Sequence, residues 1–488
     1  MKKNFIFIIL FITINLYSLN YITTAESLSW SGAYTSVADG FEAILYNPAG
    51  LYMTSVRYGL NLFGNYGVRV YTNSISTDHV LKFFEKGINN ENATDLFTSF
   101  LNFMPPNGLD TGFDISMLNF MTYFRLNTWT LGVSVIPKTS FTTTLEKKIF
   151  ESILQNLDLT EPVTANWSVN FIQYIDFSVN LSTRAKFLEK HLTAIDAIYV
   201  GITGHFYLPT MFIRAKSNDT SISSFKTNSV YGFYGYKISI KGDAYANLAS
   251  FITEPIKASG TMNSLPDNGG DYINPLINQA GSVGFGFGVD MGFIVKFNRF
   301  VRVGFAINDL GFFVFPKTAK LTLNTEANLT PDVSSDSLTF NFDDFQNDLT
   351  NGMLNGLQNI TDGSVQGWMP SMTFRLGVAV TPIRHKYIDL IIAADISVSD
   401  LNRTILGDYA TFNIAMGVEF TPKVNWVEFP MRVAFSYNTQ ANNPALSFGL
   451  GLYLGPVEME IAVKGIEILI TEWGAKEVGV GLDFKLEF

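Results

Sequence analysis

The side chains that most often carry out chemistry in proteins are few and scattered in this sequence. The four histidines show no paired metal-ligand spacing: His79, His191, His205 and His385. Neither a Gly-x-Ser-x-Gly nucleophile motif nor a phosphate-binding loop with its lysine is present. A hydrolase needs a serine or aspartate within reach of a histidine, which folding could still supply from distant positions. The sequence motifs therefore predict no enzyme, no metal site and no cofactor.

One glycine-rich segment, residues 284–290, invites comparison with a dinucleotide-binding loop. Its glycine spacing is wrong for that fingerprint. Glycine instead alternates strictly with Val283, Phe285, Phe287 and Val289. This alternation predicts a barrel strand whose inward positions are small because something fills the lumen there.

The overall composition is that of a membrane protein rather than a soluble one. Of the 488 residues, 47% are hydrophobic and only 16% are charged. The net charge of −10, without a basic patch, argues against a nucleic-acid partner. Because the chain has no cysteine, a lipoprotein anchor, a thiolate metal site and a disulfide framework are excluded.

The N-terminus has the features of an export signal. Lys2 and Lys3 precede a short apolar run at 5–16, and Thr23-Thr24-Ala25 offers small residues for cleavage. We therefore expect residues 1–25 to be a signal peptide and the mature chain to begin near Glu26. The alternative is an uncleaved anchor helix.

Beyond this run, polar residues interrupt every apolar segment before it reaches the length of a membrane-spanning helix. A membrane protein without such helices must be a closed barrel, since unpaired backbone groups cannot face lipid. The last strand, 477–488, shows the expected period of two, with one face apolar and the other small or charged. A half-buried soluble strand would alternate in the same way, but the pattern repeats many times along this chain.

Counting such segments predicts an all-β, antiparallel transmembrane barrel of about 14 strands. They lie near 56–71, 113–126, 128–137, 166–183, 197–214, 282–296, 299–323, 374–380, 386–398, 406–421, 431–437, 445–455, 457–468 and 477–488. The even number places the short connections at one end, which is the periplasmic end in such barrels, although 184–196 is long for a periplasmic turn. The segment 228–247 is strand-like, but a further crossing would break the parity, so we place it above the membrane.

The other end receives four long insertions, near 72–112, 138–165, 215–281 and 324–369. Apolar residues at helical spacing predict helices at 145–157 and, more weakly, at 345–360. Such helices could form a landing site for a hydrophobic ligand or simply pack against other loops.

The chain ends in an aromatic residue at the close of an alternating strand. Phe488, with Gly481, Phe484 and Leu486 before it, resembles the C-terminal signal that bacterial outer-membrane barrels present to their assembly machinery. We expect the barrel-assembly machinery and outer-membrane lipid to be partners of this chain.

A small segment between the export signal and the first strand must be accommodated by the barrel. It contains Gly32-Ala33-Tyr34, Ala38-Asp39 and Ala43, and it ends in Asn47-Pro48-Ala49-Gly50-Leu51. Proline at 48 fixes the chain direction and removes a hydrogen-bond donor, and Asn47 before it is restricted to extended or turn geometry. An ordinary turn leading into the first strand is the simpler interpretation of the same residues.

This segment resembles the N-terminal hatch of the long-chain fatty-acid transporter (FadL-type) outer-membrane proteins, in which an Asn-Pro-Ala motif precedes the first strand. A weaker similarity joins the Gly-x-Asp-x-Gly strand at 288–292 to the Asn308-Asp309-Leu310-Gly311 segment that follows. The resemblance implies a hatch at 26–55 inside a barrel formed by 56–488. Asn47, Pro48 and Ala49 are the positions that match the family motif, and the ligand-contacting residues have no match.

The resemblance also implies a function. In that family, outer loops capture hydrophobic molecules, which pass to a pocket beside the hatch and leave laterally through the wall. We therefore expect a bacterial outer-membrane channel for passive uptake of hydrophobic compounds such as long-chain fatty acids. The alternative is a non-transporting barrel that serves as a surface adhesin, antigen or secretion-machinery scaffold. A soluble all-β exported protein is a third possibility.

Overall fold

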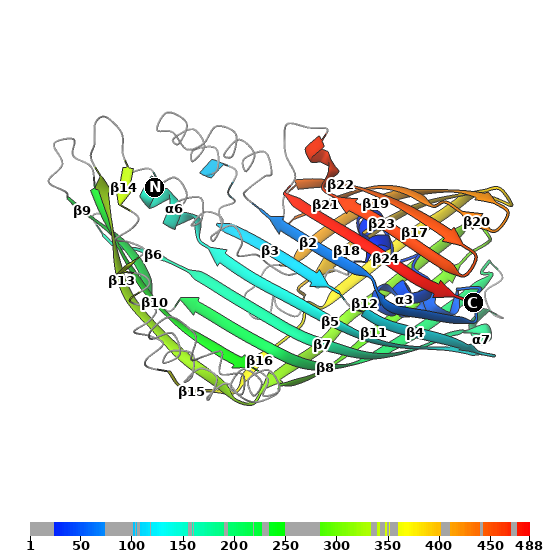
Figure 1. Ribbon diagram of the computed structural model, residues 1–488, viewed down its shortest axis with the longest axis horizontal. Helices are drawn as coiled ribbons and strands as arrows, with labels where there is room; N and C mark the ends of the chain where they lie inside the picture. Colours follow the sequence, from blue (N-terminus) through cyan, green and yellow to red (C-terminus); the bar gives the residue numbers. More distant parts are fainter. Residues whose placement is uncertain are drawn as a thin grey trace.

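The fold is a closed β-barrel with a small helical plug inside one end, as seen in a computed structural model of the chain (Figure 1). The structure describes residues 24–73, 101–102, 104, 108–117, 119–154, 159, 161–189, 194–217, 219–226, 234–248, 284–332, 339–341, 347–348, 351, 360–401, 410–439, 443–469 and 476–488. The expected signal peptide and most of the helical pattern at 345–360 lie outside these residues.

The barrel wall has fourteen positions, each paired antiparallel with its neighbours, and β24 pairs with β1 and β2 to close the ring. The predicted fold class is therefore confirmed. In order, the positions are β1 (Tyr58–Gly64) continued by β2 (Tyr66–Thr72), β3 (Leu109–Ser116) continued by β4 (Asn119–Leu126), β5 (Trp129–Leu145), β7 (Trp167–Arg184), β8 (Ala197–Ser217), β11 (Phe285–Lys296), β12 (Val301–Phe315), β17 (Thr373–His385), β18 (Ile388–Ser399), β19 (Thr411–Val424), β21 (Met431–Asn438), β22 (Asn443–Leu454), β23 (Val457–Lys464) and β24 (Glu477–Glu487).

Two of the predicted strands are each divided in two. The first breaks between β1 and β2 at Asn65, whose φ of 59° is left-handed. The second breaks between β3 and β4, and Gly64 of β1 lies opposite Asn119 at the start of β4. The prediction missed this irregularity because polar residues such as Asn61 and Asn65 also fit an ordinary inward-facing position. Both are fully buried, and their side chains hydrogen bond to each other at 2.8 Å.

Several strands continue beyond the ring at the end opposite the plug (Figure 1). The predicted strand 128–137 extends to Leu145, and the predicted strand 299–323 breaks at Pro316 into β12 and β13 (Thr318–Asp332). β10 (Tyr234–Leu248) pairs with β8 and β13, so it continues the wall above β11 and adds no crossing. Short strands complete this outer sheet: β6 (Val163–Ala165), β9 (Thr220–Lys226), β14 (Thr339–Asn341), β15 (Thr361–Gly363) and β16 (Gln366–Trp368).

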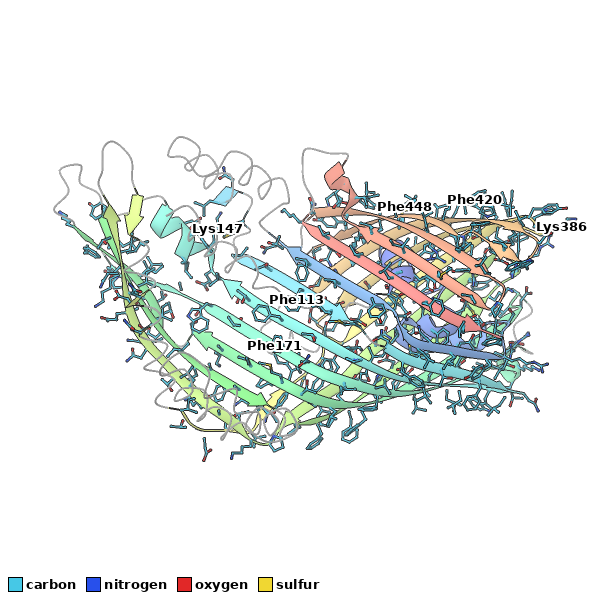
Figure 2. All side chains as sticks on the ribbon, in the orientation of Figure 1. Phe113, Lys147, Phe171, Lys386, Phe420 and Phe448 are labelled. Atoms are coloured by element: carbon cyan, nitrogen blue, oxygen red, sulfur yellow. The ribbon has the colours of Figure 1, made fainter. Side chains whose placement is uncertain are left out.

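The outer surface of the ring is an apolar belt. In β21 exposed and buried residues alternate, with Val433 and Phe435 outside and Arg432 inside. Phe420 and Phe448 likewise project outward (Figure 2). Because only a closed barrel can present such a belt to lipid with its backbone satisfied, the chain is a multi-pass outer-membrane barrel. No helix among the described residues is long and apolar enough to cross a membrane.

The short connections gather at the plug end of the barrel, as predicted. Strand β20 (Val427–Glu428) belongs to one of these turns, and the longer connection after β7 contains a one-turn helix, α7 (Lys186–Glu189). At the opposite end, α6 (Lys147–Leu154) and η4 (Ile466–Leu469) follow strands. The helix predicted at 145–157 is thus present over 147–154, while residues 155–157 lie outside the described part of the chain.

The plug consists of α2 (Ala25–Ser29), α3 (Gly40–Tyr46) and the 3₁₀ helix η1 (Pro48–Tyr52), which lie within the ring near the C-terminus (Figure 1). Almost every residue from Thr24 to Tyr52 is buried. Thr24 and Ala25, which the sequence places just before the mature start, are also buried, and the Thr24 side chain caps α2.

Candidate functional site

The Asn47-Pro48 turn is the centre of the plug. The Asn47 side chain is fully buried; its amide donates to the Thr35 carbonyl at 2.8 Å and its Oδ1 accepts from the Ala49 backbone N–H at 3.2 Å. Pro48 occupies the first turn of η1, where a missing N–H costs nothing. The turn therefore fixes α3 and η1 to the loop that contains Thr35.

Glycines in the wall provide the space into which this turn fits. A Cβ on Gly292 of β11 would lie 2.1 Å from Asn47 Oδ1, and one on Gly201 of β8 would lie 2.3 Å from the Pro48 carbonyl. On β12, a Cβ on Gly304 would lie 2.5 Å from the Thr35 carbonyl oxygen. The plug backbone thus approaches the wall more closely than any side chain would allow.

Wall side chains also hold the plug by polar contacts. Asp395 of β18 accepts hydrogen bonds from the backbone N–H groups of Tyr34 and Thr35, at 3.0 and 2.7 Å. Arg375 of β17 lies over the Tyr46 ring, 4.1 Å from its centroid. Hydrogen bonds to a buried carboxylate are stronger than neutral ones, so Asp395 is a principal anchor of the plug loop.

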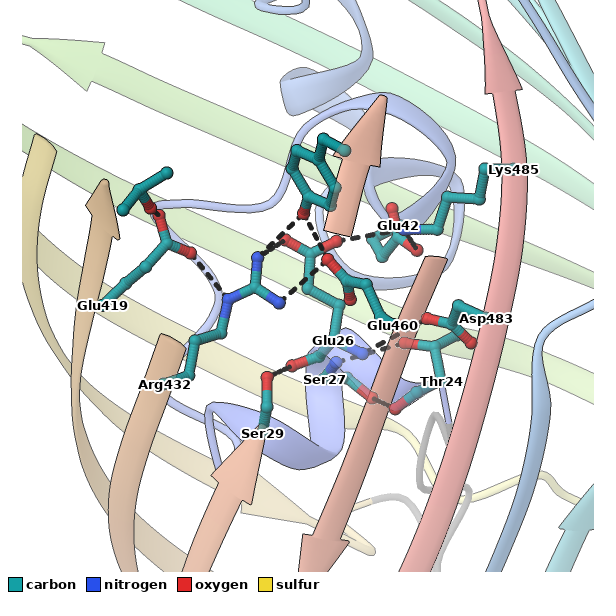
Figure 3. A network of polar contacts seen from close by, with 12 residues as sticks. Thr24, Glu26, Ser27, Ser29, Glu42, Glu419, Arg432, Glu460, Asp483 and Lys485 are labelled. Carbon is teal, nitrogen blue, oxygen red and sulfur yellow. Dashed lines mark hydrogen bonds and ion pairs between the residues drawn. The ribbon is translucent and has the colours of Figure 1, made fainter. Parts of the chain in front are cut away.

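A buried charge cluster joins α2 and α3 to the wall strands β19, β21, β23 and β24 (Figure 3). Arg432 of β21 pairs with Glu26 of the plug at 3.2 Å and with Glu419 and Glu460 of the wall at 2.6 and 2.9 Å. Lys485 of β24 pairs with Glu26 and Glu42 of the plug. Each cation therefore bridges plug and wall, and removing either would leave buried carboxylates uncompensated.

Three plug carboxyl groups have shifted pKa values. Burial would raise the pKa of Glu26, but Lys485 and Arg432 outweigh it and lower the pKa. Burial raises the pKa of Glu42 well above its usual value despite the nearby Lys485. Asp39 has an exposed side chain, yet it lies inside the ring, and this enclosure together with Glu26 raises its pKa to about 7.

Beside the plug the lumen contains a small cavity that opens toward solvent. Its apolar lining includes the side chains of Leu45 of the plug and Ile136 of the wall. Most of the other lining residues are polar or charged. Its lining residues are Thr24, Leu45, Asp114, Ile115, Ser116, Ile136, Lys138, Thr139, Ser140, Tyr174, His205, Asp290 and Asp309.

The charged side is built around His205 of β8. Its Nδ1 lies 2.9 Å from Asp176 of β7 and its Nε2 lies 3.2 Å from Asp290 of β11. Lys138 of β5 pairs with the other oxygen of Asp176 at 2.9 Å. The sequence analysis found the histidines scattered and missed this cluster; the only signal was that these residues lie at inward positions of their strands. Among the described residues, no group of three or more His, Cys, Asp or Glu is placed to hold a metal ion.

A β-bulge in β12 adds one further carboxylate to the cavity. The pairing of β11 with β12 shifts register between Val289 and Met291, so that Asn308 and Asp309 together face Asp290. Both contact it: Asn308 Nδ2 at 3.2 Å and the Asp309 backbone N–H at 2.6 Å. Asp309 has a left-handed φ of 59°, which turns its side chain into the cavity.

An aromatic cluster lies above the charged groups. Tyr174, Tyr207 and Phe313 pack together with centroid distances of 4.7–5.6 Å. A Cβ on Gly288 would meet the Tyr207 hydroxyl, and one on Gly286 would lie 3.0 Å from Phe313. The sequence predicted that something fills the lumen beside these glycines, and the structure places wall aromatics there rather than the plug.

The four residues of the predicted C-terminal assembly motif lie on the two faces of β24. Gly481 faces inward, where a Cβ would lie 2.7 Å from Ala25, whereas Phe484 and Phe488 are exposed on the outer face. Leu486 pairs with Leu60 at the seam of the barrel. The Phe488 backbone also exchanges hydrogen bonds with Tyr58. The motif therefore lies at the closing seam of the ring.

Comparison with solved structures finds transport proteins of similar architecture at low sequence identity. A Pseudomonas aeruginosa FadL homologue is 9% identical, with coverage of 97% of this chain and 99% of that chain and a TM-score of 0.47. The Ralstonia pickettii toluene transporter TbuX is 11% identical, with coverage of 97% of this chain and 100% of that chain and a TM-score of 0.43. The CymD monoaromatic hydrocarbon channel is 11% identical, with coverage of 96% and 99% and a TM-score of 0.44.

A search of curated proteins finds no match. The model of a "Family of unknown function (DUF5723)" matches residues 48–463, from the plug turn to the penultimate strand. Since this match spans most of the barrel, the chain belongs to the DUF5723 family.

Proposed function

We propose that this protein is an outer-membrane channel for passive uptake of hydrophobic compounds such as long-chain fatty acids. The observation that carries the proposal is a closed barrel whose lumen holds both a fitted plug and an open cavity beside that plug. A rigid scaffold would need neither.

A lateral exit for the compound would lie where the strand ladders are irregular. Ile115, Ser116 and Ile136 line the cavity at the level where β3 gives way to β4. At the same level β1 gives way to β2 at Asn65, whose buried side chain is hydrogen bonded to that of Asn61. Interrupted ladders are the places where a barrel wall opens with least loss of hydrogen bonds.

The plug would act as the gate for this route. Leu45 lines the cavity, and the Asn47-Pro48 turn fixes the helix that carries it. A shift of the turn would therefore change the floor of the cavity without breaking the wall. Ala49, Gly50 and Leu51 belong to the same gate, because they form η1 against β8 and β11.

Uptake by cells that lack the chain tests the proposal. We expect deletion to lower the uptake of a radiolabelled long-chain fatty acid and of an uncharged hydrocarbon, and complementation to restore both. Asn47→Ala should impair uptake while the protein still shows the heat-dependent gel shift of an assembled barrel. Unchanged uptake of both compounds in the deletion strain would overturn the proposal.

The C-terminal motif would serve assembly. Phe488 is 61% exposed at the barrel seam, where the assembly machinery could bind the strand before the ring closes. Phe488→Ala should lower the amount of barrel in the outer membrane more than it lowers the stability of the barrel that does assemble.

One observation favours a surface-binding function instead. Strands β8, β10 and β13 continue past the ring and form an outer sheet on the side away from the plug. Such a sheet could serve an adhesin or a secretion scaffold. Removing residues 215–281 should then abolish partner binding and leave uptake unchanged, whereas a channel entrance would lose uptake.

A further inference from the structure

The charges around the cavity do not balance locally. Asp114 is paired with Arg69 at 3.5 Å. Asp176 is shared by Lys138 and His205, and Asp290 contacts the other nitrogen of His205. After these pairings the Asp309 carboxylate remains, with no hydrogen bond or ion pair to any described residue.

Asp309 is nevertheless almost enclosed, since only 9% of its surface is exposed. Lys138 attracts it electrostatically, but the ion pair of that lysine is with Asp176. The bulge that carries Asp309 is an extra residue in the strand, held by hydrogen bonds to Asp290. The Asp309 oxygens are not among the fully enclosed side-chain atoms that lack a partner, so they reach the cavity, where a donor from outside can bind them.

The apolar and aromatic residues of the cavity lining indicate that the ligand also has an apolar part. Leu45 and Ile136 offer an apolar surface, and Tyr174 adds an aromatic ring. A cation is attracted to carboxylates and to the faces of aromatic rings, while an alkyl chain gains from contact with leucine and isoleucine. The cavity thus combines a site for a positive head with a site for a short apolar tail.

We propose that this cavity binds a small amphipathic ammonium compound, with its ammonium group on Asp309 and its alkyl part against Leu45 and Ile136. The proposal rests on the proposed function and assigns this one cavity to amine-bearing amphiphiles, as a further class of compound beside those named for the channel as a whole. An ammonium group supplies the donors that Asp309 lacks. A carboxylate head would meet Asp290 and Asp309, and the cations Lys138 and His205 are already paired with Asp176 and Asp290. The arrangement favours an organic cation over a metal ion, because no metal-ligand group is found among the described residues.

Three probes with the same alkyl chain separate the contributions of head and tail: octylammonium, octanol and octanoate. Binding is measured by calorimetry on the full-length barrel in a non-ionic detergent. We expect octylammonium to bind at least about tenfold more tightly than either other probe, because only it supplies a charged donor. Octanoate binding equal to or tighter than octylammonium binding would overturn the proposal.

Substitution of the carboxylate tests its role directly. Asp309→Asn should weaken octylammonium binding about tenfold and leave octanol binding unchanged. The matched control is Asp362→Asn, which removes an exposed carboxylate of β15 outside the cavity lining. It should change neither the binding of octylammonium nor that of octanol. If Asp309→Asn weakens the binding of octylammonium and of octanol equally, the heat-dependent gel shift shows whether the barrel has assembled. An equal loss of binding in an assembled barrel contradicts the ammonium site.

Transport measurements separate this inference from the proposed function. If liposomes containing the wild-type protein pass an uncharged hydrocarbon but the protein does not select octylammonium, only the ammonium site is wrong. If octylammonium binds through Asp309 but no compound passes the membrane, the channel function is wrong and the site remains.

Discussion

The lumen has two levels that are built differently from the same strands. At the plug level, nearest the short turns, β8 and β11 present Gly201 and Gly292 to the plug backbone. A few residues away along both strands, at the cavity level, His205 and Asp290 contact each other and line the cavity. One pair of strands thus provides both a tight fit and a cavity.

The two levels also use charge differently. At the plug level, Arg432 and Lys485 each join carboxylates of the plug to the wall. At the cavity level, Lys138 and His205 join wall residues only, and Asp309 lacks a partner among the described residues. The plug level therefore stabilises the docked plug, while the cavity level keeps a group available for a ligand. Substitutions matched between the levels can test this difference.

Arg432→Met should have the largest effect on stability. It leaves Glu419 and the buried Glu460 without their guanidinium and leaves Glu26 with Lys485 alone, at a cost of about 3–5 kcal/mol. The measurement is the temperature at which the folded gel band disappears. Lys138→Met at the cavity level should lower the stability much less, because Asp176 still has His205 as an ion-pair partner and the lysine side chain is 24% exposed. Equal losses in the two variants would contradict the distinction between the levels.

Gly201→Ala tests the tight fit. The new methyl group would lie 2.3 Å from the Pro48 carbonyl, so the plug turn must move, at a cost of roughly 1–3 kcal/mol. We expect more frequent openings in single-channel recordings. Gly204→Ala is the matched control on the same strand, because a Cβ there meets nothing within 4 Å. A conductance change in the control as large as in Gly201→Ala would exclude a steric effect on the plug.

The barrel was predictable because its signal repeats. Each lipid-facing strand must alternate along its whole length, so Val433 and Phe435 or Leu482 and Phe484 mark a crossing without reference to the rest of the fold. The breaks at Asn65 and Pro316 were not predictable in this way. A polar residue that faces the lumen and one that forms a bulge look alike when only the period of two is read.

The site was less predictable because its residues come from separate strands. The plug could be expected from the Asn47-Pro48 turn and its position before the first strand. The contact of His205 with Asp176 and Asp290 depends on the register of β7, β8 and β11, which a one-residue slip would destroy. Local sequence carries no record of that register, so the charged cavity could only be seen in the folded chain.

Asp395→Asn should weaken the plug by a smaller amount. Asparagine keeps an acceptor for the Tyr34 or Thr35 N–H but loses the charge that strengthens both bonds, so we expect a loss of about 1 kcal/mol. Protease sensitivity of the plug in assembled barrels is the measurement. Asp389→Asn, at the Lys423 ion pair near a turn, is the control and should leave the plug protected. A plug that stays fully protected in Asp395→Asn would show that the steric fit alone holds it.

The smallest effect concerns the pH dependence of the plug level. The docked plug raises the pKa of Asp39 from 3.8 to about 7, so docking favours its protonated form. This contribution is complete below about pH 4 and is lost as the pH rises through 7, and Glu42 acts in the same direction. Glu26 has a lowered pKa, so docking favours its ionised form, and its contribution to docking is lost only when the pH falls into the acid range. Channel openings should therefore become more frequent between pH 5 and pH 8, with a shallow slope because the Asp39 side chain reaches water.

Asp39→Asn should make this slope shallower still, while the affinity of the cavity for octylammonium stays as in the wild type. An unchanged slope would assign the pH dependence to another group.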